Sequence, residues 1–277
     1  MSSIRPSRLY SHNLIAAEEK YYTSKVYQSK SFHASSYIDC GRQQAYGLLG
    51  TPATDDKFVV QYKRDAMLGE VVHGILQNWS IADGKIAMVP NFDYDQKTRE
   101  AARKRGDLSP AIEMPINEHT ISQELYKEFK GRYRLGGRVD GVLDRKGSLV
   151  VLEIKTLAAK YMDNPSPLYK QIYLDKLYHF ESQVQIYMHF LGAKEGIILA
   201  VNRDRFLNMM MGNSAYEWED VYMEYRVDYN PLFVERELER LEKLNALVTK
   251  KELPDPEPDR GSCRFCNWRS ICPNPGK

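Results

Sequence analysis

The segment from residue 134 to residue 156 constrains the fold of this chain more than any other part. Residues 135–143 are predicted to form one strand, residues 144–148 a polar turn, and residues 149–156 a second strand. This assignment rests on two apolar runs rich in valine and leucine, which flank a turn that contains Gly147. The sequence therefore predicts a β-hairpin within a sheet.

Charged residues interrupt both strands of this hairpin at matching positions. Asp140 and Glu153 are equidistant from the turn at residues 146–147, so strand pairing would make them near-opposite neighbours, and Lys155 shares the face of Glu153. Two adjacent carboxylates repel each other in a sheet, and a divalent cation such as magnesium or manganese removes that conflict. Lys155 could then orient or deprotonate a water molecule, or stabilise charge on a phosphate. The competing interpretation is a solvated hairpin face.

Two predicted helices add polar residues to this pattern. Residues 66–79 have apolar positions at helical spacing, which predicts an amphipathic helix that carries His73. A second helix is predicted over residues 180–191, and Gln183 and Tyr187 lie one turn apart on it. Taken singly, a helical histidine is more often a packed residue than a ligand.

The four cysteines form a second distinctive set. Cys263, Cys266 and Cys272 are clustered, whereas Cys40 lies more than 200 positions earlier. Disulfides are disfavoured in a cytosolic chain, and three clustered thiolates need a fourth ligand to complete a metal site. Zinc with four cysteines usually pairs two short knuckles, so the one-plus-three pattern favours a cubane iron–sulfur cluster. Zinc and a disulfide are the alternatives.

The ordered motifs resemble those of RecB-type nucleases, a branch of the PD-(D/E)XK fold. The resemblance rests on His73, on the segments 137–141 and 153–156, and on the segment 183–187. The cysteine pattern is similar to that of the CRISPR-associated iron–sulfur exonuclease family and of the AddB nuclease domain, so that the likeness spans residues 36–273.

This resemblance implies a role for each site residue. The metal ligands would be His73, Asp140, Glu153 and the backbone carbonyl of Ile154, while Lys155 would be the catalytic lysine. Gln183 and Tyr187, on the helix after the hairpin, would contact DNA or steady the site. A [4Fe–4S] cluster would be held by the four cysteines, Cys40, Cys263, Cys266 and Cys272.

The implied architecture is an α/β fold with a mixed central sheet flanked by helices. An iron–sulfur cap would join the two ends of the chain. Residues 1–35, which are polar and rich in tyrosine, are expected to be an extension, and residues 36–252 the nuclease core. Insertions are expected at about 85–134 and 158–178, and residues 253–277 would form the iron–sulfur segment together with Cys40.

Further elements follow from periodicity, caps and turn residues. Pro231 is expected to open a long charged helix. The charge-rich stretch 96–107 is expected to be a surface helix, or else a patch that contacts phosphates. The remaining predictions are a helix over 40–49, strands over 196–202 and 219–227, a helix over 231–250 and a stiff connector over 253–258.

Composition narrows the function classes only weakly. A net charge of +2 is too balanced to indicate a nucleic-acid binder by itself. There is no apolar run long enough for a membrane span and no secretory signal, so a cytoplasmic protein is expected. Some of the 19 tyrosines could stack on unpaired bases.

The expected activity is hydrolysis of DNA phosphodiester bonds with Mg²⁺ or Mn²⁺. By resemblance, the chain would be an exonuclease acting on single-stranded or frayed DNA ends. The cluster is expected to stabilise the structure and to take no part in redox chemistry. Two alternatives stay open: a non-catalytic DNA-binding accessory subunit, and a structure-specific endonuclease with a structural zinc.

Overall fold

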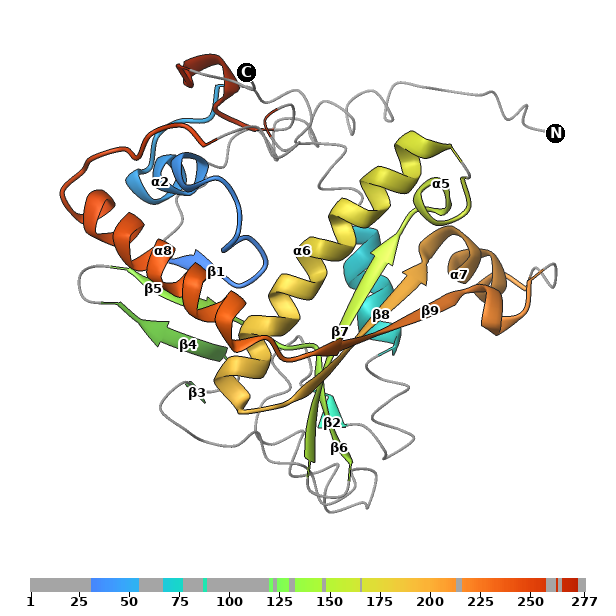
Figure 1. The fold of residues 1–277 in the computed structure, drawn as a ribbon. Helices are drawn as coiled ribbons and strands as arrows, with labels where there is room; N and C mark the ends of the chain where they lie inside the picture. Colours follow the sequence, from blue (N-terminus) through green and yellow to red (C-terminus); the bar gives the residue numbers. More distant parts are fainter. Residues whose placement is uncertain are drawn as a thin grey trace, which may run out of the picture.

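The computed structural model of the chain contains two β-sheets with helices packed against them (Figure 1). The structure describes residues 31–54, 67–76, 87–88, 120–121, 124–129, 133–145, 148–164, 166–212, 216–257, 263 and 266–273.

The larger sheet has five strands in the order β2-β6-β7-β8-β9. Strands β7 and β8 are parallel, whereas every other neighbouring pair in this sheet is antiparallel. The predicted mixed sheet is therefore confirmed. The strands are β2 (Ala87–Met88), β6 (Gly141–Arg145), β7 (Ser148–Leu157), β8 (Glu195–Asn202) and β9 (Tyr222–Asp228).

The smaller sheet has four strands in the order β1-β5-β4-β3. Strands β3 and β4 lie within the stretch 85–134 that was expected to be an insertion, and β1 begins inside the expected N-terminal extension. These strands are β1 (Phe32–His33), β3 (Thr120–Ile121), β4 (Glu124–Glu128) and β5 (Arg134–Gly137).

The prediction of one continuous strand over residues 135–143 is wrong. The chain leaves the smaller sheet after Gly137 and joins the larger sheet at Gly141. A β-carbon on Gly137 would lie 2.7 Å from both the Ala34 Cβ and the Tyr187 hydroxyl. Glycine in a strand often marks such a close approach, and here it marks the point where the chain changes sheets.

Among the described residues, six α-helical segments pack on these sheets or connect their strands. The longest, α6, follows β7 and leads back to β8, which gives the parallel pairing of these two strands. A side chain on Gly196 of β8 would collide with Val184 of α6, so glycine at this position permits close helix–sheet packing. The segments are α2 (Gly41–Leu49), the helix at 67–76, α5 (Ala159–Met162), α6 (Pro167–Leu191), α7 (Arg203–Met210) and α8 (Pro231–Thr249).

Helix α6 begins 13 residues earlier than predicted, at Pro167 instead of residue 180. The expected insertion at 158–178 therefore holds α5 and the first half of α6. The fully buried residues of α6 start at Ser182, whereas Leu168 and Leu174 are exposed. The apolar residues of this first half, such as Ile172 and Leu177, are at most partly buried, so this part of the helix packs less closely than the second half.

Other sequence predictions shift by a few residues. Helix α8 confirms the predicted helix with Pro231 in its first turn, and α2 confirms the helix after Cys40. The last strand starts at Tyr222, after a turn of 3₁₀ helix at Trp218–Asp220. The predicted helix at 96–107 lies outside the described residues. Within the described part of the chain, every helix is too short or too polar to cross a membrane.

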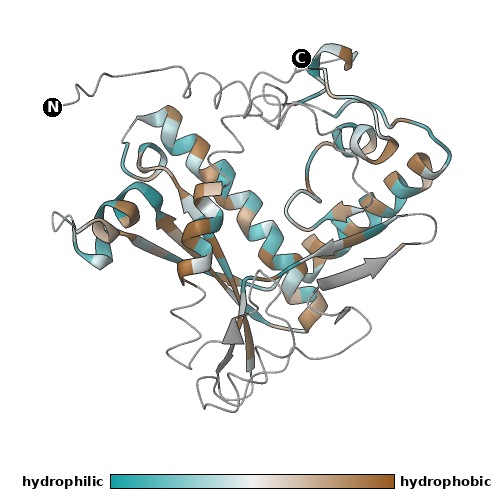
Figure 2. Ribbon diagram, turned by 180° about the vertical axis from the view of Figure 1, so that it is seen from behind, coloured by the Kyte–Doolittle hydropathy of each residue, from teal (hydrophilic) through white to brown (hydrophobic). Residues whose placement is uncertain are grey.

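Strand β7 is buried on both faces, which explains its apolar sequence. On one face α6 and α8 cover a core that includes Val151, and on the other the helix at 67–76 and α7 cover a core that includes Leu152 and Ile154. Polar and apolar residues alternate along α6 and α8 (Figure 2), as expected for helices that pack by one side. The buried polar residue Glu153 on this strand is therefore energetically costly and needs a reason.

Candidate functional site

The start of β6 brings Asp140 beside the carboxyl-terminal half of β7. The strand register pairs Gly141 with Leu152, so Asp140, one residue before β6, lies next to Glu153 and Ile154 as predicted. The Asp140 Oδ2 accepts a hydrogen bond of 2.7 Å from the Ile154 amide. This bond fixes the Asp140 carboxylate against β7, at the point where the two strands part.

Glu153 is the most unusual group of the site. Only 2% of it is exposed, and burial followed by the Asp140 charge raises its pKa to about 7, against the opposing effect of Lys155. Its Oε1 lies 2.5 Å from the Lys155 Nζ. Among the described residues, Oε2 of Glu153 has no hydrogen-bond partner. A buried oxygen in this state favours a proton or a cation beside it.

Lys155 is held by residues of α6. Its Nζ donates to the Gln183 Oε1 at 2.9 Å and lies 5.3 Å from the centre of the Phe180 ring. The Gln183 amide in turn donates to the Tyr187 hydroxyl at 3.0 Å. Gln183 and Tyr187 therefore position the lysine. Phe180 was not predicted, although its place one turn before Gln183 on the same helix would have indicated it.

His73 reaches the site from the helix at 67–76. Its Nδ1 lies 3.5 Å from the Asp140 Oδ1. The helix approaches β7 closely at Gly69, where a β-carbon would lie 2.8 Å from the Thr156 Oγ1. This approach brings His73, one turn further along, over the carboxylate of Asp140.

The two carboxylates and the imidazole of the site form separate pairs and do not converge on one point. Asp140 turns to Ile154 and His73, while Glu153 turns to Lys155. In the part of the chain that the structure describes, no group of three or more His, Cys, Asp or Glu side chains has the spacing of a metal site. The donor set nevertheless fits a hard divalent cation, because it offers two carboxylates, an imidazole and the unbonded oxygen of Glu153.

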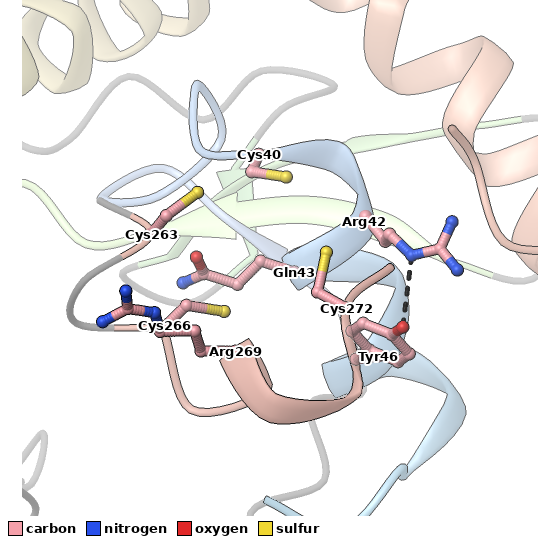
Figure 3. A pocket seen from close by; sticks show the side chains of 8 residues that line it. All are labelled: Cys40, Arg42, Gln43, Tyr46, Cys263, Cys266, Arg269 and Cys272. Atoms are coloured by element: carbon pink, nitrogen blue, oxygen red, sulfur yellow. Dashed lines mark hydrogen bonds between the residues drawn. The ribbon is translucent and has the colours of Figure 1, made fainter. Parts of the chain in front are cut away.

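The four cysteines lie around one pocket at the edge of the molecule (Figure 3). Cys40 precedes the first turn of α2, and Cys272 follows a 3₁₀ turn near the end of the chain. None of the four is in a disulfide, and their sulfur atoms point toward the space that the labelled residues enclose in Figure 3. The lining residues are Cys40, Arg42, Gln43, Tyr46, Cys263, Cys266, Arg269 and Cys272.

A few polar contacts hold the two chain ends together beside this pocket. The Glu257 carboxylate accepts a 2.8 Å hydrogen bond from the Gly41 amide at the start of α2. The Trp268 indole donates to the Thr51 carbonyl at 2.9 Å, and its ring stacks on Tyr46 with centroids 5.8 Å apart. The segments that carry Cys40 and the later cysteines are therefore tied independently of the thiols.

The chemistry of this pocket fits a cysteine-ligated metal group. Four thiols from both chain ends line it, and Arg42 and Arg269 lie among them. Among the described residues, the four sulfur atoms are not spaced as the ligands of one metal ion.

Comparison with known proteins agrees with this fold. The family model of the PD-(D/E)XK nuclease superfamily matches residues 33–273. No curated protein matches the chain in sequence. The crystal structure of SSO0001 is similar with a TM-score of 0.51 and 17% identity, covering 97% of this chain and 98% of that one. At this identity the likeness concerns the fold alone.

Two exonuclease structures are similar at a lower level. A phage-related exonuclease from Haemophilus somnus 129PT has 13% identity and a TM-score of 0.35, over 81% of this chain and 96% of that one. An alkaline exonuclease, LHK-Exo from Laribacter hongkongensis, has 11% identity and a TM-score of 0.32, over 84% and 93%. The family match covers both the carboxylate site and the four cysteines.

Proposed function

The chain belongs to the PD-(D/E)XK nuclease superfamily, and from this premise we propose that it is a metal-dependent DNA exonuclease. Its substrate would be single-stranded or frayed DNA ends, and its reaction the hydrolysis of phosphodiester bonds. The preference for ends rests on the similarity of its motifs to those of RecB-type nucleases.

One observation carries the proposal: a buried carboxylate pair with a lysine at hydrogen-bond distance. Glu153 lies inside the fold beside Asp140, keeps one oxygen without a hydrogen bond, and contacts Lys155 at 2.5 Å. A purely structural ion pair would satisfy both oxygens of a buried carboxylate. The arrangement instead costs stability in a way that is typical of a functional site.

The cation would be held by the carboxylates of the site and by groups close to them. We assign His73, Asp140, Glu153 and the Ile154 carbonyl as its ligands. When bound, Mg²⁺ or Mn²⁺ stabilises negative charge on the phosphate and lowers the pKa of water.

The protein side chains would do the remaining work. Lys155 would hold a proton near the attacking water and place positive charge against the phosphate oxygens. Gln183 fixes the lysine from one side, since it accepts from Nζ at 2.9 Å, and its own amide is fixed by Tyr187 at 3.0 Å. The buried hydroxyl of Tyr187 has a raised pKa, chiefly because of burial, so it stays protonated and acts as a positioning group.

A [4Fe–4S] cluster on Cys40, Cys263, Cys266 and Cys272 is part of the same proposal. The support is the single pocket that all four thiols line. The cluster would stabilise the junction of the two chain ends. The reducing cytoplasm is the expected location for such thiols.

The direct test is degradation of end-labelled DNA by anaerobically purified protein, with Mg²⁺ or Mn²⁺ present. We expect the wild type to release mononucleotides or short products from single-stranded DNA, and Lys155→Ala and Asp140→Ala to be severely impaired. Lys194→Ala is a matched control, because it removes an exposed lysine at the far end of α6.

Metal analysis and the absorption spectrum of the same samples test the cluster. Iron with broad visible absorption supports [4Fe–4S], and colourless protein with zinc contradicts it. If the cluster-loaded wild type degrades no DNA of any end type, an accessory DNA-binding role replaces the nuclease. Internal cuts in circular DNA would contradict the exonuclease assignment but not the nuclease assignment.

A further inference from the structure

Two tyrosines and two lysines gather where α5 meets the first half of α6. The rings of Tyr161 and Tyr169 lie 6.0 Å apart. The ammonium groups of Lys160 and Lys176 lie 4.9 Å and 5.1 Å from the centre of the Tyr161 ring. We call these four residues the α5–α6 platform. None of them belongs to the site described above.

The α5–α6 platform continues the face of α6 that holds the candidate catalytic lysine. Lys176 and Tyr169 precede Gln183 by two and four helical turns, so all three lie on one side of the helix. At the rise of an α-helix they are about 10 Å and about 21 Å from Gln183 along the axis. Strand β7, which carries Lys155, points directly at α5 in Figure 1.

The α5–α6 platform is partly exposed to solvent, and its backbone is hydrogen-bonded to α7. Lys160 is exposed, and Tyr161, Tyr169 and Lys176 are half-buried. The α5 backbone is anchored because the Ala159 amide donates to Asp204 of α7 at 2.7 Å.

The neighbouring acidic group is directed away from these lysines. Asp163, the acidic residue that follows α5, lies 3.2 Å from Arg205 and accepts from the Asn202 amide. The negative charge of Asp163 is therefore paired with Arg205 of α7. The aromatic rings and the exposed Lys160 are the part of this surface that a ligand can reach.

Aromatic rings beside lysines are the chemistry that binds unpaired nucleic acid. Bases stack on the rings whatever their sequence, and the ammonium groups meet the phosphates. A base pair inside a duplex has its faces covered by its neighbours, so it cannot stack on a side chain in this way. A surface of this chemistry would therefore favour single strands over duplexes.

We propose that the α5–α6 platform binds the unpaired strand that leads to the Lys155 site. This inference rests on the proposed function and deepens it, because it assigns single-strand preference to named residues. Bases stack on Tyr161 and Tyr169, and Lys160 and Lys176 contact the backbone some two to four helical turns from Gln183.

The test is the affinity for a fluorescently labelled single-stranded oligonucleotide, measured by anisotropy in EDTA so that the DNA stays intact. We expect Tyr161→Ala to weaken single-strand binding roughly tenfold, the loss typical of one stacked base. Tyr161→Phe keeps the ring and should bind as the wild type does. Binding of a blunt hairpin duplex should change little in either variant.

The contribution of the two lysines to binding is tested with a matched control. Lys160→Ala with Lys176→Ala should weaken single-strand binding and reduce its salt dependence. Lys194→Ala removes a lysine with the same ring geometry, 5.4 Å from the Tyr229 ring, at the opposite end of α6 and should change neither. Equal thermal unfolding of all variants excludes misfolding.

The outcomes separate this inference from the proposed function. If the wild type cleaves and binds single strands but Tyr161→Ala behaves identically, the platform assignment is wrong and the nuclease stands. Equal loss in the alanine and phenylalanine variants also overturns it, because stacking would not be the cause. If the wild type neither binds nor cleaves DNA, the proposed function itself fails.

Discussion

The carboxylate site and the cysteine pocket are built in opposite ways. Asp140 and Glu153 are 13 positions apart and meet because β6 and β7 are neighbours in one sheet. Both are buried, with 8% and 2% exposure. Their separation is therefore set by strand pairing and needs no cofactor.

The cysteine pocket joins residues from the two ends of the chain. Cys40 and Cys263 are more than 200 positions apart, and all four cysteines are only half-buried. Contacts such as that of Arg42 with the Pro254 carbonyl, at 2.7 Å, hold the two segments together beside the pocket. Closing so long a loop costs chain entropy, and a group bound by the thiols would add to the protein contacts that offset this cost.

This difference predicts that the two regions fail differently when they are mutated. Loss of a group at the carboxylate site should remove activity and leave the fold intact. Loss of a ligand at the cysteine pocket should lower stability first, and activity only as a consequence. The following predictions test that division.

Cys266→Ser should have the largest effect on the molecule. Removing one of four ligands would release the cluster, whose binding free energy contributes to folding, and we expect a loss of about 4 kcal/mol or more in the free energy of unfolding. Iron content and anaerobic urea unfolding measure it. Ser270→Ala, in the same segment as Cys266, removes an exposed hydrogen bond of 2.6 Å to Thr54 and is the control. An iron-free serine variant as stable as the wild type would show that the pocket has no structural cofactor.

Lys155→Ala should reduce DNA cleavage by about 10²–10³-fold while leaving the fold unchanged. The Lys155 Nζ lies between the Gln183 amide oxygen of α6 and the buried Glu153 carboxylate. When the lysine is absent, Glu153 can take up a proton because burial already raises its pKa, so no unpaired charge is left inside the fold. Single-turnover cleavage rates and thermal unfolding are the two measurements. If the variant unfolds at a much lower temperature, the lysine is a structural ion pair and the contrast between the regions weakens.

The two regions also differ in how far the sequence predicts them. The hairpin, with Asp140, Glu153 and Lys155 on it, was predictable because its contacts are local and its strands have apolar runs. The cysteine set was visible as a spacing pattern. That Cys40 lies in one pocket with the others depends on the packing of α2 against α8 and on the connector, and no local signal encodes this packing.

The errors also have physical causes. Strand β5 reads as a continuation of β6 because both are short apolar segments, and only the tertiary contact of Gly137 with Tyr187 separates them. The first half of α6 was missed because its side chains pack on little. Strand β4 owes its place to pairing with β5, which the sequence of β4 alone does not indicate.

Glu153→Gln should stabilise the metal-free protein at alkaline pH. The folded state raises the pKa of Glu153 from 4.5 to about 7. Its contribution to stability is therefore fully present below pH 4.5 and is lost as the pH rises through 7. In EDTA at pH 8 we expect the variant to be more stable by on the order of 1–3 kcal/mol, and near parity with the wild type at pH 4.5.

Urea unfolding in EDTA at these two pH values measures the effect. Addition of Mg²⁺ at pH 8 should stabilise the wild type and not the variant, since only the carboxylate gains from the cation. Parallel pH dependence of the two proteins would mean that Glu153 is not strained in the metal-free fold.

Glu257→Ala should have the smallest effect and should link the two regions. The Glu257 carboxylate accepts from the Gly41 amide at the start of α2 and lies 3.5 Å from Arg240 of α8. Its loss leaves a helix N-terminus without an acceptor, which costs about 1 kcal/mol, and loosens the segment that precedes the cysteines. We therefore expect a small fall in stability together with faster loss of iron to a chelator. Glu252→Ala, on an exposed position of the same connector, is the control. If iron loss is unchanged while stability falls, α2 is capped by Glu257 but the cysteines are positioned by the cluster itself, and the two chain ends are then joined by the cofactor and not by the protein contacts around it.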